Sequence, residues 1–195
     1  PSVGLGNFLP SLFVKYANAK EVNLDVCDID NNSIDILKEL LKTLDIPSNF
    51  RISFINDDTL LHIFSKHYDI VVGNPPYMKF NRDKELLNRY RFFATNTNTN
   101  NLFSFFIEKA MTIADYVALI VPKSLINAPE FNKTRELMCR CQVSHIIDYG
   151  ESAFKGVKIE TISFVLNTKK KPGQTIIESY INNSIATKEQ SYIMD

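Results

Sequence analysis

The sequence lacks any apolar run long enough to cross a membrane, and its first residues do not follow the pattern of a signal peptide. It also contains few metal-binding side chains, with three cysteines and three histidines that do not have the spacing of a metal site. Cys139 and Cys141 form a Cys-x-Cys pair, which we interpret as ordinary reduced thiols. The sequence therefore predicts a cytoplasmic protein that has no membrane anchor and binds no metal.

An excess of charge of either sign is also missing. Lys and Arg number 22, Asp and Glu also number 22, and the formal net charge is +0. A domain that binds nucleic acid tightly by itself is usually basic, because it must neutralise phosphates. The balance argues against independent tight binding of DNA. It is compatible with a catalytic domain whose DNA-binding part lies elsewhere.

The 195 residues are enough for one α/β domain with a substantial core, and too few for two full-sized ones. Apolar residues recur with periods of about two and about 3.6, which predicts strands alternating with helices in a mostly parallel, doubly wound sheet. We expect one domain over residues 1–195, with its ligands beyond the carboxyl ends of the strands. The predicted helices are 7–18, 32–44, 82–93, 102–114 and 131–141, and the predicted strands are 21–27, 51–55, 68–72, 116–121, 143–148, 159–166 and, at an edge, 175–181.

Two further segments are assigned from composition. Residues 59–66 are expected to form one or two helical turns. The tract from Thr95 to Asn101, with the sequence TNTNTNN, is polar and low in complexity, so we predict a mobile loop there.

Three motifs lie where such a sheet would bind a ligand. The first contains Gly4 and Gly6 at the entry to the first helix, where glycine allows a ligand to approach the backbone. An ordinary tight turn has the same pattern. The second is Asp28-Ile29-Asp30, directly after a strand. A carboxylate at that place can bind both hydroxyls of a ribose, and it can equally cap the next helix.

The third motif is the most specific one. Asn74-Pro75-Pro76-Tyr77 follows a strand of the buried type, and such a string is rare by chance. Its structural alternative is a rigid turn, because two prolines fix the backbone. Chemically, the Asn74 side-chain oxygen and the Pro75 carbonyl can accept hydrogen bonds from an amino group that is becoming tetrahedral. Tyr77 offers a flat face on which an unstacked base can lie.

The three motifs and their order resemble the amino-methylating DNA methyltransferases, specifically the adenine-N6 group of bacterial restriction–modification systems. The resemblance implies a Rossmann-like fold with a late antiparallel hairpin. It also implies methyl transfer from S-adenosylmethionine to the N6 amino group of adenine in DNA after base flipping. Asn74, Pro75, Pro76 and Tyr77 would then be catalytic. The cofactor-binding residues that it implies are Pro1, Gly4, Gly6, Phe8, Asp28, Ile29, Asp58 (with Asp57 as a rival) and Asn74.

The resemblance extends along most of the chain. Residues 102–110 and 121–125 resemble the family's next helix and its Val-Pro-x-Ser strand end, and residues 147–154 resemble its late hairpin. Phe154 would then pack on the flipped base together with Tyr77. Cytosine-N4 enzymes more often have serine in place of Asn74, so the asparagine favours adenine.

The resemblance also implies parts that we do not find in the sequence. In the family, a central first strand precedes the glycine loop, and a target-recognition domain follows the core. We therefore expect a catalytic-core fragment that reaches double-stranded DNA through a recognition domain elsewhere, with a restriction endonuclease as a partner or a fusion.

Three alternatives remain open at this point. Asn-Pro-Pro-Tyr also occurs in methyltransferases that act on protein glutamine or on ribosomal RNA. A second alternative is a non-catalytic fragment that binds cofactor or DNA. A dinucleotide oxidoreductase is the third, but its usual glycine fingerprint is longer, and it leaves Asn-Pro-Pro-Tyr unexplained.

Overall fold

The computed structural model describes residues 1–154, 156 and 158–194. The chain divides into two compact units, Pro1–His62 and Ile63–Asp195, and each has its own sheet and core. Within the described ranges, no helix is both long and apolar enough to cross a bilayer.

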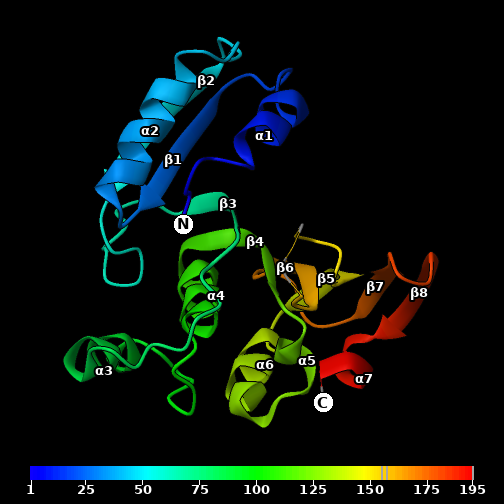
Figure 1. Ribbon diagram of the computed structural model, residues 1–195. Coiled ribbons are helices and arrows are strands. Elements are labelled where there is room, and N and C mark those ends of the chain that lie inside the picture. Colours follow the sequence, from blue (N-terminus) through cyan, green and yellow to red (C-terminus); the bar gives the residue numbers. More distant parts are fainter. Residues whose placement is uncertain (155, 157, 195) are drawn as a thin grey trace. The chain divides into compact units, whose positions relative to one another are not determined.

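The first unit is a two-stranded parallel sheet with two helices (Figure 1). Its strands pair from Val22 with Phe50 to Asp28 with Asn56, so both strands end at the same edge. Leu9 and Phe13 from the first helix pack with Leu37 from the second helix in a small apolar core. The elements are α1 (Leu9–Lys15), β1 (Val22–Asp28), α2 (Asn31–Leu41) and β2 (Phe50–Asn56).

The second unit contains a six-stranded mixed sheet in the order β3-β4-β6-β5-β7-β8. Four strands run in one direction, and β6 and β8 run against them. The predicted α/β class and the late antiparallel hairpin, formed by β5 and β6, are therefore confirmed. The strands are β3 (Tyr68–Gly73), β4 (Ala114–Pro122), β5 (Gln142–Gly150), β6 (Thr161–Asn167), β7 (Gln174–Ser179) and β8 (Ser184–Glu189).

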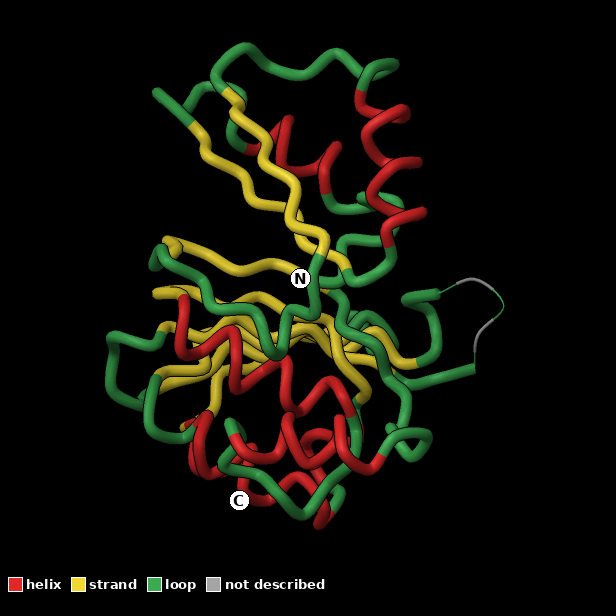
Figure 2. Tube along the Cα trace, turned by 90° about the vertical axis from the view of Figure 1, so that its left-hand side faces the viewer, coloured by secondary structure: helices red, strands yellow, loops and turns green. Residues whose placement is uncertain are grey.

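The helices of the second unit form a layer beside its sheet. Figures 1 and 2 show α4, α5 and α6 on the same side of the strands. Phe103 of α4, Phe131 and Leu166 of β6 are almost completely inaccessible to solvent and belong to one continuous core. The helices are α3 (Lys84–Phe92), α4 (Leu102–Ile113), α5 (Ser124–Asn127), the 3-10 turn η1 (Pro129–Phe131), α6 (Asn132–Met138) and α7 (Gln190–Met194).

Several predicted boundaries differ from the observed ones. The helix predicted at residues 131–141 begins as the 3-10 turn η1 and ends at Met138. In the segment 59–66, the Leu61 and His62 N–H groups both donate to the Asp58 carbonyl, which makes one turn, and the rest of the segment is not helical. The strand predicted at the edge is β7, and it is covered on its outer side by β8, which we did not predict. Every residue of β8 is exposed, so the strand has no apolar alternation in its sequence to reveal it.

We predict that Leu166→Ala lowers the free energy of unfolding by about 2–5 kcal/mol, because it removes a fully buried side chain from a central strand. Ile185→Ala is the matched control, since that side chain is 74% exposed on the edge strand β8. Urea unfolding followed by far-ultraviolet circular dichroism measures both variants. Equal effects of the two substitutions would contradict the assignment of the core.

Candidate active site

At the carboxyl edge of the first sheet, the aspartate that ends β1 holds the glycine loop. Asp28 Oδ2 accepts a hydrogen bond from the Gly4 backbone N–H at 2.8 Å. The other oxygen, Oδ1, accepts one from the Asp30 backbone N–H at 3.0 Å. The Val3 N–H also donates to the Cys27 carbonyl at 3.0 Å, so the loop runs alongside the end of the strand. Two motifs that are separate in the sequence are therefore in contact.

The two glycines of this loop have different roles. Gly6 has φ +76°, and a Cβ atom there would lie 2.7 Å from Leu37 Cδ1 and 2.8 Å from Leu9 Cδ1. Gly4 has φ +52°, and a Cβ atom there would meet no other atom within 4 Å. Gly6 therefore allows the helices to pack closely. Gly4 is half-buried, and its missing side chain leaves room for a ligand to approach the backbone.

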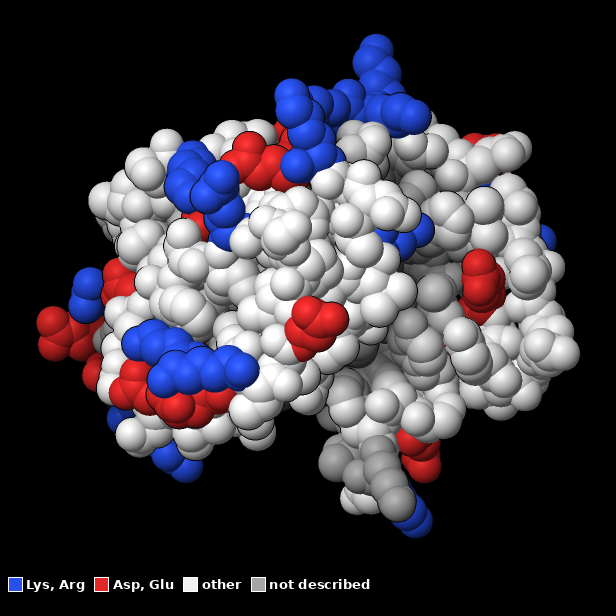
Figure 3. All heavy atoms as spheres, turned by 90° about the horizontal axis from the view of Figure 1, so that it is seen from above, with Lys and Arg blue, Asp and Glu red and all other residues white. Residues whose placement is uncertain are grey.

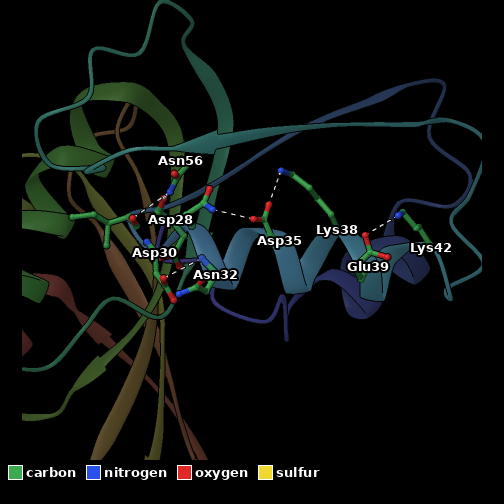
Figure 4. Close-up of polar contacts among 10 residues, drawn as sticks. Asp28, Asp30, Asn32, Asp35, Lys38, Glu39, Lys42 and Asn56 are labelled. Atoms are coloured by element: carbon green, nitrogen blue, oxygen red, sulfur yellow. Dashed lines mark hydrogen bonds and ion pairs between the residues drawn. The ribbon is translucent and has the colours of Figure 1, made fainter.

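The two aspartates of the second motif have separate tasks. Asp30 is the N-cap of α2, and its carboxylate accepts hydrogen bonds from the backbone N–H groups of Asn32 and Ser33. Figure 4 shows this capping contact, together with the Asn56 side chain that donates to the carbonyls of Asp28 and Ile29. The Ile29 side chain is 67% exposed. Asp30 is thus the capping residue, and Asp28 remains the candidate for binding a ribose.

The aspartates after β2 lie close to the end of β1. The Asp57 N–H donates to the Asp28 carbonyl at 3.1 Å. The Asp57 carboxylate contacts His62 Nδ1 at 2.7 Å, and this hydrogen bond lowers the pKa of Asp57. Asp58 Oδ1 accepts a hydrogen bond from the Leu60 N–H at 3.0 Å. Both aspartates are thus in the same unit as Asp28, and the choice of Asp58 over Asp57 stays a prediction.

The last two predicted cofactor residues are Pro1 and Phe8. Phe8 directly precedes α1 as its N-cap residue, and its carbonyl accepts a hydrogen bond from the Leu12 N–H at 3.1 Å. Pro1 and Phe8 are half-buried in the same unit as Asp28. Their contact with a ligand stays a prediction.

The Asn-Pro-Pro-Tyr motif begins directly after β3, at the carboxyl end of that strand. The Asn74 Oδ1 atom is buried and accepts no hydrogen bond from the part of the chain that the structure describes. Pro75 is buried and Pro76 is half-buried. Leaving a buried carbonyl oxygen without a donor is unfavourable, so an acceptor kept in this state is suited to a ligand that supplies the donor.

Tyr77 is fixed by both its hydroxyl group and its ring. The hydroxyl donates to the Ile120 carbonyl of β4 at 3.0 Å, and burial raises the pKa of this hydroxyl. The ring meets Phe103 edge-on at a centroid distance of 6.4 Å, and it meets Phe154 at 6.3 Å. The two aromatic residues predicted to hold a base are therefore neighbours, although they are far apart in the sequence.

The tract Thr95–Asn101 is a loop, as predicted. The sequence did not predict that hydrogen bonds anchor this loop to the helices beside it. Asn96 and Thr99 are almost completely buried. The backbone N–H groups of Thr95 and Asn96 donate to the two carboxylate oxygens of Glu108. From the sequence we predict only a helix over residues 102–114, and Glu108 is not singled out there. Glu108 is a single carboxylate in a predominantly apolar helix, and it follows a loop, residues 95–101, that is rich in hydrogen-bond donors. This combination could have indicated that the carboxylate binds the loop.

Cys27 and Cys141 are buried, free cysteines. Burial raises the pKa of the Cys27 thiol and raises that of Cys141 to about 11. Such thiols are poor nucleophiles at neutral pH. Among the residues that the structure describes, no three His, Cys, Asp or Glu side chains gather in an arrangement suited to a metal ion.

Charge of both signs is present on the face of the molecule that Figure 3 shows. On this face, basic and acidic side chains lie beside one another in several places. This pattern agrees with the zero formal net charge.

Comparison with known proteins identifies related sequences. A family model described as "Eco57I restriction-modification methylase" matches residues 11–154. The Type II methyltransferase M.VspI of Vibrio sp. (strain 343) is 24% identical over 168 residues, which cover 85% of this chain and 40% of that protein. M.AccI of Acinetobacter calcoaceticus is 23% identical over 177 residues, which cover 85% of this chain and 31% of that protein. The chain thus spans less than half the length of either relative.

Solved structures agree on the fold. A protein of Listeria monocytogenes described as a class I S-adenosylmethionine-dependent methyltransferase superposes with a TM-score of 0.74 at 17% identity, covering 92% of this chain and 56% of that one. The type IIG restriction endonuclease BpuSI also gives a TM-score of 0.74 at 17% identity, covering 99% of this chain and 28% of that one. The predicted Rossmann-like methyltransferase fold is confirmed, and family and fold together imply S-adenosylmethionine as the cofactor.

The residues at the edge of the first sheet fit this cofactor. The Asp28 carboxylate has the acceptors that ribose hydroxyls would need, and Ile29 has an exposed apolar side chain against which a flat adenine ring would pack. The room left by the missing side chain at Gly4 is compatible with the close approach of a ligand.

We predict that Asp28→Ala raises the dissociation constant for S-adenosylmethionine by about tenfold to a hundredfold, because it removes charged acceptors and releases the Gly4 N–H. Isothermal titration calorimetry measures the effect. The control is Asp35→Ala on α2, whose carboxylate contacts Asn31 and Lys38 on the exposed face of the helix. An unchanged affinity in folded Asp28→Ala protein would remove Asp28 from the site.

Proposed function

We propose that this chain, which belongs to the Eco57I restriction-modification methylase family, methylates the N6 amino group of adenine in DNA. The observation that carries the proposal is the buried Asn74 Oδ1 at the carboxyl end of β3, which finds no hydrogen-bond donor among the residues that the structure describes. The substrate amine would supply the donor that this oxygen lacks.

The amino nitrogen of adenine is a poor nucleophile, because its lone pair is delocalised into the ring. Two acceptors, Asn74 Oδ1 and the Pro75 carbonyl, would bind its two N–H groups. They would favour the tetrahedral nitrogen of the transition state over the flat nitrogen of the free base. Pro75 and Pro76 limit the movement of the backbone, so few atoms need to reorganise when the reaction takes place.

Tyr77 and Phe154 would hold the base after it leaves the duplex. Their rings lie 6.3 Å apart with an interplanar angle of 64°. A base that stacks on both rings at once would therefore require the Phe154 ring to turn. The Tyr77 ring itself is fixed by its hydroxyl group, so Tyr77 would be the rigid side of the base site.

S-adenosylmethionine brings an activated methyl group that needs no strong general base. The residues of this chain bind and orient it. Asp28 would accept the ribose hydroxyls, Ile29 and Asp58 would contact the adenine ring, and the loop of Gly4 and Gly6, with Pro1 and Phe8, would hold the methionine part.

Membership of a restriction–modification family favours DNA over protein glutamine and ribosomal RNA as the methyl acceptor. Asparagine at position 74, where cytosine-N4 enzymes more often have serine, favours adenine. The zero net charge favours DNA recognition by a separate domain, with a restriction endonuclease as a partner or fusion.

Asn74→Ala is predicted to lower the rate of methyl transfer by about a hundredfold or more, because it removes an acceptor that acts in the transition state. Cofactor affinity should change by less than about threefold, since the cofactor contacts that we propose lie mainly at Asp28 and its neighbours. Labelled methyl transfer to unmethylated DNA and calorimetry give the two quantities. Asn88→Ala, at an exposed position of α3, is the control. A parallel loss of transfer and cofactor binding would contradict the role given to Asn74.

Tyr77 allows the ring and the hydroxyl to be tested separately. Tyr77→Phe keeps the ring and loses the hydrogen bond to Ile120, so we expect less than about a tenfold fall in kcat/KM. Tyr77→Ala also loses the stacking face, and a fall of about a further tenfold or more is expected. Because burial raises the pKa of the hydroxyl, wild-type activity should show no fall near pH 10 from ionisation of Tyr77. Steady-state kinetics on DNA would contradict this role if both variants lost the same activity.

A further inference from the structure

Glu108 is a buried carboxylate that the proposed mechanism does not use. Its residue is 6% exposed, in the middle of helix α4. Oε2 accepts a hydrogen bond from the Thr95 N–H at 2.6 Å, and Oε1 accepts one from the Asn96 N–H at 2.9 Å. Charged acceptors make the stronger hydrogen bonds, and both donors here belong to the backbone. Glu108 therefore fixes the path of the main chain at the start of the loop.

The Asn96 side chain continues the network away from Glu108. Its Nδ2 atom donates to the Glu130 carbonyl at 2.9 Å and to Thr134 Oγ1 at 2.8 Å. Its Oδ1 atom accepts a hydrogen bond from the Asn98 N–H at 3.0 Å. Thr134 also contacts Ser104 of α4 at 2.7 Å. The loop is thus joined to two helices, α4 and α6, through side chains that solvent does not reach.

The Glu130 carboxylate then connects this loop to the segment after Tyr77. Oε2 accepts a hydrogen bond from the Thr99 hydroxyl at 2.8 Å, and Oε1 pairs with Lys79 Nζ at 3.2 Å. Thr99 Oγ1 in turn accepts a hydrogen bond from the Asn101 N–H at 3.0 Å. One carboxylate therefore holds both the end of the loop and the residue two positions after Tyr77.

Backbone pairing completes the connection. The Phe80 N–H donates to the Asn100 carbonyl at 2.8 Å, and the Leu102 N–H donates to the Met78 carbonyl at 3.1 Å. Between these bonds, Lys79 and Asn101 form an antiparallel bridge. The catalytic peptide 74–77 thus lies between two fixed segments, β3 before it and this short ladder after it.

We propose that Glu108 is a positioning residue: through the loop 95–101 and the ladder 78–80, it holds the Asn74–Tyr77 peptide in the geometry that methyl transfer requires. Glu108 touches no substrate and acts through the backbone of the loop. This inference deepens the proposed function and rests on it for the identity of the reaction. Preorganised acceptors lose their effect when the peptide that carries them can move.

The test is Glu108→Gln in the full-length protein. The substitution preserves the shape, but the amide nitrogen of glutamine faces a backbone N–H that also donates, so one hydrogen bond is lost and repulsion replaces it. We expect kcat for DNA methylation to fall by about tenfold to a hundredfold, with the dissociation constant for S-adenosylmethionine unchanged within about twofold. Glu108→Asp keeps the charge and should recover part of the loss. Glu136→Gln, at an exposed position of α6, is the matched control.

Hydrogen exchange measured by mass spectrometry distinguishes a local loosening of the catalytic peptide from a general loss of stability, because a general loss would speed exchange in every peptide. Under conditions where Glu108→Gln is fully folded, exchange should be faster in peptides that cover residues 76–80 and 95–101 and unchanged in β1. If Glu108→Gln does not fold, Thr99→Val replaces it, because it removes the hydroxyl that joins Glu130 to the Asn101 N–H and is expected to change the same peptides.

The inference is overturned if folded Glu108→Gln keeps wild-type kcat, or if its kcat and cofactor binding fall together with unchanged exchange at residues 76–80. The exchange measurement needs no DNA. It therefore tests the connection from Glu108 to Tyr77 even if the wild-type protein methylates a different amine, in which case only the proposed substrate would be wrong.

Discussion

The peptide from Asn74 to Tyr77 is held at both ends, and this constraint relates the fold to the chemistry. Before it, β3 pairs with β4, and Gly73 lies opposite Leu119. After it, Met78 and Phe80 pair with Leu102 and Asn100. Between these fixed ends lies the Asn74 Oδ1 acceptor, to which no group in the described ranges 1–154, 156 and 158–194 donates. The fixed ends hold the backbone that carries this oxygen, so little of the peptide has to reorganise when a ligand supplies the donor.

The sheet order of the second unit contributes to the same constraint. Strand β6 runs antiparallel between β4 and β5, and the connection from β5 to β6 contains Phe154. Because β4 also supplies the carbonyl of Ile120 that fixes Tyr77, the two aromatic residues meet at the edge of one sheet. Phe103, which packs on Phe131 in the core at a centroid distance of 4.7 Å, also contacts the Tyr77 ring.

In the first unit, Asp28 has a corresponding role. Its carboxylate connects the glycine loop to the end of β1 by accepting the Gly4 N–H and the Asp30 N–H. Each oxygen keeps acceptor capacity for a second donor, which is what ribose hydroxyls would need. The neighbouring Asp30 caps α2, so two acidic residues two positions apart have different structural roles.

The alternation of strands and helices could be predicted from the sequence, because apolar periodicity follows directly from which faces are buried. Asn74 to Tyr77 and Asp28 could be singled out because the carboxyl ends of strands are where ligands bind. The exposed strand β8 was not predictable, since none of its residues is buried. The anchoring of the Asn/Thr loop was missed for a different reason. Local composition indicates a polar loop, but whether such a loop is buried depends on partners such as Glu108, Glu130 and Thr134, which come later in the chain.

The most direct test of the central claim is to incubate the full-length protein with labelled S-adenosylmethionine and unmethylated duplex DNA, and to identify the modified nucleoside. Labelled N6-methyladenine that depends on Asn74 is the result that our account predicts. Label on cytosine would contradict the assignment of adenine. Label on protein or ribosomal RNA, with DNA unlabelled, would contradict DNA as the substrate.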